Sequence, residues 1–158
     1  MYSQNINTNG VVVPICFPPL TAVTIKELHS LTKEVAPLVL CVVETQVSKE
    51  RVEGLKSSFG FDKSFAVSST GCSGGLGIFW NNNLSVQILP YSRYHIDVII
   101  SEGNSDPWRL TAVYGEAQVV DRYKTWDMLK SIKPTSSLPW VCIGDFIEVL
   151  HRAEHVGV

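Results

Sequence analysis

Three polar side chains stand where apolar runs of this sequence stop. Asp145 follows the run Trp140 to Ile143 after a single glycine, Glu44 follows Val39 to Val43, and Tyr114 ends a third run. Such runs are typical of buried strands, and a sheet holds a side chain at its strand end rigidly. The two acids are therefore candidates for metal binding or acid–base chemistry, and the tyrosine for hydrogen bonding to a developing negative charge.

The chemistry that suits these side chains together is that of a divalent cation and a phosphate group. Mg²⁺ takes a few carboxylates and leaves coordination positions for water and phosphate oxygens. The hydroxyl of Tyr114 is suited to donating a hydrogen bond to the phosphate. The alternative is three strand ends that never meet, because strands often stop at Gly-Asp simply to turn. Spacing alone leaves both interpretations open.

Composition limits the class of protein. At 158 residues, 45% of them hydrophobic and 18% charged, the chain suits one globular domain. The net charge of -2 predicts that any contact with nucleic acid depends on a local patch. Four cysteines without metal-ligand spacing favour a reducing, intracellular location, nuclear or cytoplasmic. No apolar stretch is long enough for a membrane helix, so no membrane association is expected.

The first sixty residues alternate between strand and helix patterns. Val11–Val13 predicts a short strand, which Pro14 restricts to a sheet edge or a strand end. Thr24–Glu27 has the capping-box pattern and predicts the start of a helix that ends near residue 34. Residues 37–43 predict a strand buried on both faces, and Ser48–Ser58 a second helix.

The middle of the chain is a series of short strands separated by turn residues. Their predicted ranges are Phe65–Ser69, Gly75–Trp80, Leu84–Leu89, His95–Ile100 and Trp108–Tyr114. Asp121–Ile132 then returns to helical spacing before the run that ends at Asp145. We therefore expect an α/β fold in which two mostly antiparallel sheets pack face to face, with helices outside.

Seven stretches of the sequence, in order, resemble the endonuclease/exonuclease/phosphatase superfamily. The likeness is greatest to the endonuclease domain of plant non-long-terminal-repeat retrotransposons, where that domain accompanies a reverse transcriptase. The matching stretches are Thr24–Leu28, Val43–Thr45, Ser73–Leu76 with Trp80, Tyr91–Asp97, Trp108–Gly115, the Trp126 helix and Leu138–Phe146. The resemblance implies a four-layered α/β sandwich that hydrolyses DNA phosphodiesters with Mg²⁺ or Mn²⁺. It predicts a partial domain over residues 11–158, after a disordered segment 1–10.

The resemblance also implies roles for the three strand-end residues. Glu44 matches the metal-binding glutamate, and Tyr114 matches the active-site tyrosine that contacts phosphate. Asp145 matches the aspartate of the Gly-Asp-Phe-Asn element, which is expected to orient or deprotonate the attacking water and to lie at the metal. The Ser73–Gly77 stretch is expected to form a tight turn into a strand, because no helix follows it.

Two departures from the pattern predict weak activity or none. Ile15 and Ile147 stand where the family carries asparagines, and isoleucine has no side-chain hydrogen bond to offer. Losing one such preorganised donor typically costs about 10² to 10³ in rate. The later strands and the catalytic histidine of the family would lie beyond Val158. His151 and His155 follow a different motif and are expected to be solvated C-terminal residues.

Two further interpretations stay open at this stage. One is a non-catalytic binding module, a pseudoenzyme that keeps the sandwich but has lost the chemistry. The other is a reading frame that continues past Val158. DNA is the partner that the resemblance implies, and the sequence predicts no specific protein partner.

Overall fold

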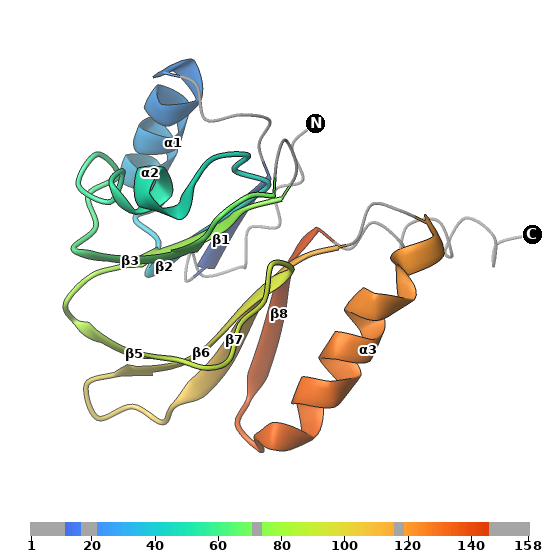
Figure 1. The fold of residues 1–158 in the computed structure, drawn as a ribbon. Coiled ribbons are helices and arrows are strands. Elements are labelled where there is room, and N and C mark those ends of the chain that lie inside the picture. The colour runs from blue at the N-terminus through green and yellow to red at the C-terminus, as the bar shows by residue number, and fades with distance from the viewer. Residues whose placement is uncertain (1–11, 17–21, 71–73, 116–118, 146–158) are drawn as a thin grey trace, which may run out of the picture.

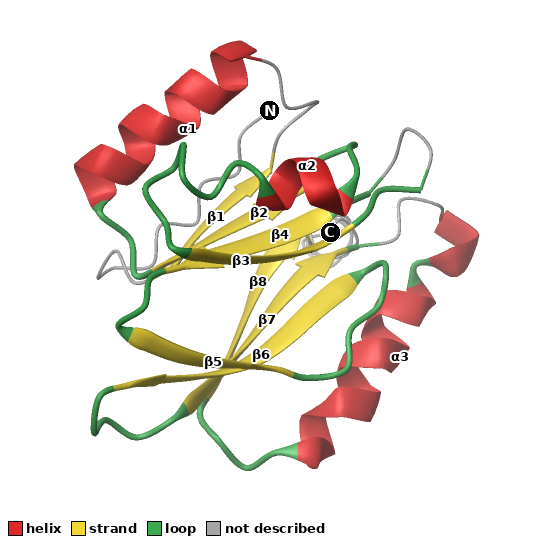
Figure 2. Cartoon of the chain, turned by 60° about the vertical axis from the view of Figure 1, so that its left-hand side comes forward, coloured by secondary structure: helices red, strands yellow, loops and turns green. Residues whose placement is uncertain are grey.

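Two sheets face each other in the computed structural model, with helices on their outer sides (Figure 1, Figure 2). The structure describes residues 12–16, 22–70, 74–115 and 119–145. In chain order the strands and longer helices are β1 Val12–Cys16, α1 Ala22–Val35, β2 Val39–Val43, α2 Lys49–Glu53, β3 Lys63–Val67, β4 Leu76–Trp80, β5 Leu84–Ile88, β6 His95–Glu102, β7 Trp108–Tyr114, α3 Tyr123–Ile132 and β8 Trp140–Asp145. Helices α1 and α2 cover one sheet, and α3 covers the other.

The first sheet has the order β1-β2-β4-β3. β1 runs parallel to β2 at the sheet edge, which confirms the position that Pro14 imposes, because proline has no N–H to give to a second neighbour. β2 is buried at all five positions, as the continuous apolar run predicted. β4 pairs antiparallel with both β2 and β3.

The second sheet has the order β5-β6-β7-β8. β5, β6 and β7 form an antiparallel meander, and β8 joins β7 in parallel after the α3 crossover. The predicted α/β sandwich of two mostly antiparallel sheets flanked by helices is confirmed.

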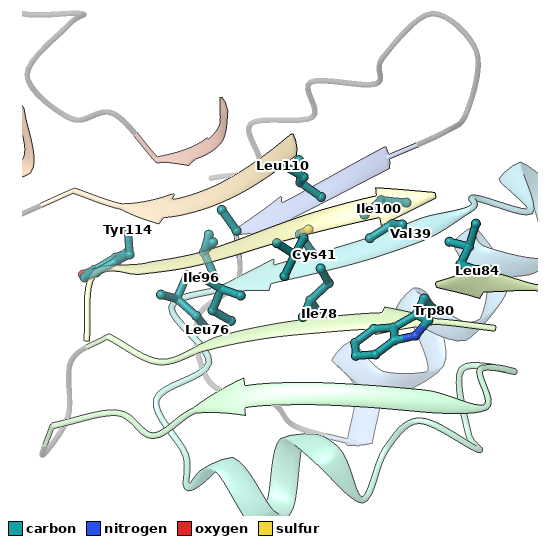
Figure 3. Packing of buried hydrophobic residues seen from close by; sticks show 13 residues of the cluster. Val39, Cys41, Leu76, Ile78, Trp80, Leu84, Ile96, Ile100, Leu110 and Tyr114 are labelled. Carbon is teal, nitrogen blue, oxygen red and sulfur yellow. The ribbon is translucent and has the colours of Figure 1, made fainter. Parts of the chain in front are cut away.

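The main core lies between the two sheets (Figure 3). Alternate residues of β6 and β7 supply one side of it, and β2 and β4 supply the other. Cys41, fully buried in this layer, packs as a small hydrophobe. A second cluster, centred on Leu28, Val52 and Phe79, joins the first sheet to its helices.

Helix boundaries depart from the sequence expectations at two places. α1 begins at Ala22, so Thr24 is already helical and the capping-box assignment was wrong. Ser48 caps α2, its Oγ accepting a hydrogen bond from the N–H of Arg51 at 3.4 Å, but the helix predicted to run to Ser58 ends at Glu53. The chain leaves the helical path because Phe59 and Phe61 both pack against Phe79 in the second cluster.

Helix α3 begins two residues later than the sequence predicts. A 3₁₀ turn over Val119–Asp121 precedes α3, so the predicted helix from Asp121 starts at Tyr123 instead. Within the described ranges no helix combines the length and apolar character needed to cross a bilayer. Residues 1–10 lie outside the described part, so their predicted disorder stays a prediction.

Candidate active site

Tyr114 and Asp145 are brought side by side by the parallel pairing of β7 and β8. They are Cα partners in the register, and the N–H of Gly115 donates to the backbone oxygen of Asp145 at 2.8 Å. The carboxyl ends of parallel strands meet at the same sheet edge, so the crossover through α3 returns the chain to the end where Tyr114 lies. The sequence-predicted tyrosine and aspartate are therefore neighbours.

Glu44 reaches the same end of the molecule from the opposite sheet. Burial raises the pKa of the Asp145 carboxyl above its ordinary value, and the negative charge of Glu44 raises it further. The two acids are therefore within electrostatic range of each other, and β2, which Glu44 follows, contacts β8, which Asp145 ends. Gly74, which accepts a hydrogen bond from the backbone of Gln46, lies beside Tyr114 as well. A Cβ added to Gly74 would be 4.0 Å from Cε1 of Tyr114.

The backbone around Glu44 is held in an uncommon conformation. Glu44 and Gln46 both have φ of 58°, in the left-handed region. The N–H of Thr45 donates to the oxygen of Gly75 at 3.3 Å, and that of Gln46 to the oxygen of Gly74 at 3.0 Å. Strain of this kind persists only where surrounding contacts over-determine it, and it gathers at functional sites.

The Gly74-Gly75 turn supports the Glu44 loop, a relation that sequence reasoning missed. The stretch was expected only to turn into a strand, and it does lead directly into β4, with φ of 79° and 96° at the two glycines. A Cβ on Gly75 would lie 2.1 Å from Oγ1 of Thr45, so only glycine lets the two loops meet. Thr45 itself is buried, and its hydroxyl has no hydrogen-bond partner among the described residues.

Substitution of Glu44 measures the effect of its left-handed backbone on stability. Glycine at this position should make the fold about 1 kcal/mol more stable than alanine does, because only glycine adopts positive φ without a Cβ penalty. Urea unfolding of Glu44→Gly and Glu44→Ala measures the difference. The same pair of substitutions at Lys130, exposed in α3, is the control, where alanine should be the more stable by about 0.5 to 1 kcal/mol. If alanine were more stable than glycine at both positions, the left-handed backbone of Glu44 would be contradicted.

The two carboxylates fit a hard divalent cation such as Mg²⁺ or Mn²⁺ better than a zinc ion. The part of the chain that the structure describes holds no group of three or more His, Cys, Asp or Glu side chains able to share one metal. A closed zinc site needs about four such ligands. Mg²⁺ is commonly held by one or two carboxylates, with water and substrate phosphate completing the shell. Glu44 and Asp145 meet that requirement.

A buried polar network fixes the strands that carry Tyr114 and Asp145. Arg109 of β7 donates to Asp97 of β6 from Nε at 2.9 Å and from a terminal nitrogen at 2.5 Å. Thr111 donates to the same carboxylate at 2.9 Å and accepts from the indole N–H of Trp140 in β8 at 2.8 Å. The guanidinium also lies 5.1 Å from the Trp140 ring centroid and donates to the backbone oxygen of Ile132 at 2.8 Å. Strands β6, β7 and β8 and the end of α3 are thereby joined.

Sequence reasoning treated Asp97 as part of an ordinary strand and missed this network. The available signal was one acid and one arginine inside otherwise apolar strands, His95–Glu102 and Trp108–Tyr114. Charged residues are almost never fully buried unless paired. An ion pair between Asp97 and Arg109 therefore follows from the sequence once their two strands are known to be neighbours.

The residues that depart from the family pattern fall partly outside the described structure. Ile15 lies in β1 beside Val42, on a strand parallel to β2, so it stands near the end that carries Glu44. Ile147, His151 and His155 lie outside the described residues. Their predicted contributions stay predictions.

The chain is similar to known proteins in structure, although its sequence matches none of the family models or curated proteins compared. Among solved structures, the endonuclease domain of TRAS1, a telomere-specific non-LTR retrotransposon, matches with a TM-score of 0.62 and 15% identity, over 85% of this chain and 58% of that one. An AP endonuclease from Leishmania major matches with a TM-score of 0.64 and 14% identity, over 85% and 54%. A 3′ phosphatase from Neisseria, bound to product DNA hairpin, matches with a TM-score of 0.58 and 12% identity, over 85% and 56%.

These likenesses define the class of fold. The chain has the fold of the endonuclease/exonuclease/phosphatase superfamily, as its ordered motifs predicted. It spans a little over half the length of the structures it matches. At 12 to 15% identity the likeness establishes the fold, and the chemistry has to be argued from this chain's own residues.

Proposed function

We propose that Glu44, Tyr114 and Asp145 form a divalent-metal-dependent phosphodiesterase site that acts on DNA, with Mg²⁺ or Mn²⁺ as the cofactor. The observation that carries the proposal is the convergence of these residues, two from one sheet and one from the other, at a single end of the sandwich. The superfamily fold, shared with DNA endonucleases and a DNA 3′ phosphatase, supports the same chemistry.

Each residue has a defined part in this proposal. Glu44 and Asp145 hold the cation, which when bound neutralises charge on a phosphodiester and polarises it. Tyr114 is placed to donate its hydroxyl to a phosphate oxygen as negative charge develops. Asp145 would also orient the attacking water and accept its proton.

We further propose that this chain is a weak enzyme. Ile15 and Ile147 replace two hydrogen-bond donors of the family pattern, and each such loss costs about 10² to 10³ in rate. A non-catalytic binding module is the second candidate. It is favoured by the same two replacements, because isoleucine offers no side-chain hydrogen bond to a phosphate or a nucleophile.

A plasmid nicking assay tests the proposal. With Mg²⁺ or Mn²⁺ we expect slow conversion of supercoiled to relaxed DNA that Asp145→Ala and Glu44→Gln both abolish. Ser85→Ala, an exposed substitution on β5, is the matched control and should leave the rate unchanged. Ile15→Asn combined with Ile147→Asn should raise the rate, because two donors return.

Two outcomes would contradict it. Nicking that survives both carboxylate substitutions would show that this site is not responsible. Rapid nicking by the unaltered chain, lost in Asp145→Ala, would instead refute the claim of impairment while leaving the site in place.

A further inference from the structure

A buried hydroxyl lies directly beside the candidate metal ligand Glu44. Thr45 is only 1% exposed, and its Oγ1 has no hydrogen-bond partner among the described residues. The buried hydroxyl of Thr111, by contrast, donates to Asp97. Burying a hydroxyl without a partner destabilises a fold, so each such group in a native structure calls for an explanation, for which an ion or a water molecule is the usual one.

The hydroxyl is held where the loop after β2 meets the turn before β4. A Cβ on Gly75 would lie 2.1 Å from Oγ1 of Thr45, so this oxygen touches the backbone of the turn. The same turn reaches Tyr114, because a Cβ on Gly74 would lie 4.0 Å from its Cε1. Leu76, which follows the turn, belongs with Tyr114 to the main core (Figure 3). The hydroxyl therefore lies at the end of the sandwich that carries the candidate site.

The backbone that carries this hydroxyl is fixed on both sides. Glu44 and Gln46 flank Thr45, and both have φ of 58°. The N–H groups of Thr45 and Gln46 donate to backbone oxygens of the turn before β4, at 3.3 and 3.0 Å. Residues other than glycine keep a left-handed backbone only where surrounding contacts impose it. The loop therefore holds Thr45 in a set position relative to Glu44.

We propose that Thr45 is a positioning residue for the candidate cation, its hydroxyl bonding to a water of the hydration shell of a cation held by Glu44 and Asp145. The inference rests on the proposed function, because it needs a divalent cation at these carboxylates. Mg²⁺ bound by one or two carboxylates usually keeps several waters. A hydroxyl oxygen has two lone pairs, so Thr45 can accept a hydrogen bond from such a water. Outer-shell partners of this kind are a major determinant of metal affinity.

The proposal predicts opposite effects of the hydroxyl with and without a cation. Without a cation the hydroxyl of Thr45 destabilises the fold, because no protein group replaces the hydrogen bonds that it makes to water in the unfolded chain. With a cation the hydroxyl gains a partner, and cation binding recovers the loss. A hydroxyl with a purely structural role would stabilise the fold in both conditions. The sign of its effect on stability therefore separates the two roles.

Thr45→Val, which replaces the hydroxyl with a methyl group in a side chain of similar shape, tests the proposal. In EDTA its urea midpoint should lie above that of the unaltered chain, because a buried hydroxyl without a partner is removed. Its affinity for Mn²⁺, measured from the electron paramagnetic resonance signal of free Mn²⁺, should be about 10-fold lower. Thr45→Ser, which keeps the hydroxyl, should bind Mn²⁺ like the unaltered chain.

Thr32→Val is the matched control. Thr32 is buried in α1, and its hydroxyl donates to the backbone oxygen of His29 at 2.9 Å. Loss of this hydrogen bond should lower the urea midpoint and leave the affinity for Mn²⁺ unchanged. The two valine variants should therefore shift the urea midpoint in opposite directions.

Carboxylate variants separate this inference from the proposed function. Glu44→Gln and Asp145→Asn should each remove most of the Mn²⁺ binding. If they do, the cation site stands, and the role of Thr45 is refuted by any of three results: unchanged Mn²⁺ affinity in Thr45→Val, a lower urea midpoint of Thr45→Val in EDTA, or an equal loss of affinity in Thr45→Ser. If the unaltered chain binds no Mn²⁺, or both carboxylate variants still bind it, the proposed cation site fails and this inference fails with it.

Discussion

Asp97→Ala is expected to destabilise the fold by about 3–5 kcal/mol, because it leaves the guanidinium of Arg109 buried without its counter-charge. The side chains of Arg109 and Asp97 are only 2% and 3% exposed, so water cannot replace the lost carboxylate. Thr111 loses its acceptor in the same substitution. A single domain is stable by only about 5–15 kcal/mol, so this loss is a large share of the total.

Urea unfolding measures the effect, with Asp127→Ala as the matched control. Asp127 is exposed on α3, and its removal should change stability by less than about 0.5 kcal/mol. The double variant Asp97→Leu with Arg109→Met should be more stable than Asp97→Ala, because removing both members of a buried pair costs less than removing one. A loss below about 1 kcal/mol in Asp97→Ala would show that the pair is not buried as described.

Gly144→Ala is the second substitution with a large expected effect. Gly144 has φ of 134°, and an added Cβ would lie 1.9 Å from the backbone oxygen of Val113 and 2.8 Å from its carbon. The backbone strain alone costs about 1–3 kcal/mol. The overlap adds to this cost, since β8 must move away from β7. The residue that moves with it is Asp145, so divalent-cation binding should weaken as well as stability.

Two other glycines separate strain from overlap. Gly60 and Gly103 also have positive φ, of 80° and 54°, yet a Cβ at either position meets nothing within 4 Å. Alanine there should cost only the strain, about 1–2 kcal/mol. Urea unfolding and Mn²⁺ titration of the three variants test this order. Equal losses of stability at all three positions, with unchanged Mn²⁺ affinity in Gly144→Ala, would contradict the close approach of β8 to β7.

The local sequence determined much of the strand framework. The unbroken apolar run of β2 required a strand covered on both faces, and it occupies the centre of its sheet. Pro14 kept its own strand at an edge, since a missing N–H is tolerated only there. These constraints act within a few residues of chain, which is why they can be recognised without knowing any neighbour.

Helix ends were less predictable, because tertiary contacts competed with local signals. The Thr24–Glu27 pattern is a valid cap in isolation, yet α1 begins at Ala22. The helix after Ser48 stops early so that Phe59 and Phe61 can pack on Phe79. Burial of two phenylalanines outweighs a few residues of helix propensity, which differs by only tenths of a kcal/mol per residue.

The candidate site shows where sequence and tertiary structure divide. The sequence by itself determined that Glu44, Tyr114 and Asp145 lie at strand ends, because each comes at the end of an apolar run. The run before Asp145 was expected to be a buried strand, but β8 is half-buried at all six positions because it stands at the sheet edge. Only the tertiary structure decided that they meet. The parallel return of β8 beside β7 aligned Tyr114 with Asp145, and the packing of the two sheets brought β2, which Glu44 follows, against both strands. Long-range packing is set by the whole core, so no local pattern encodes it.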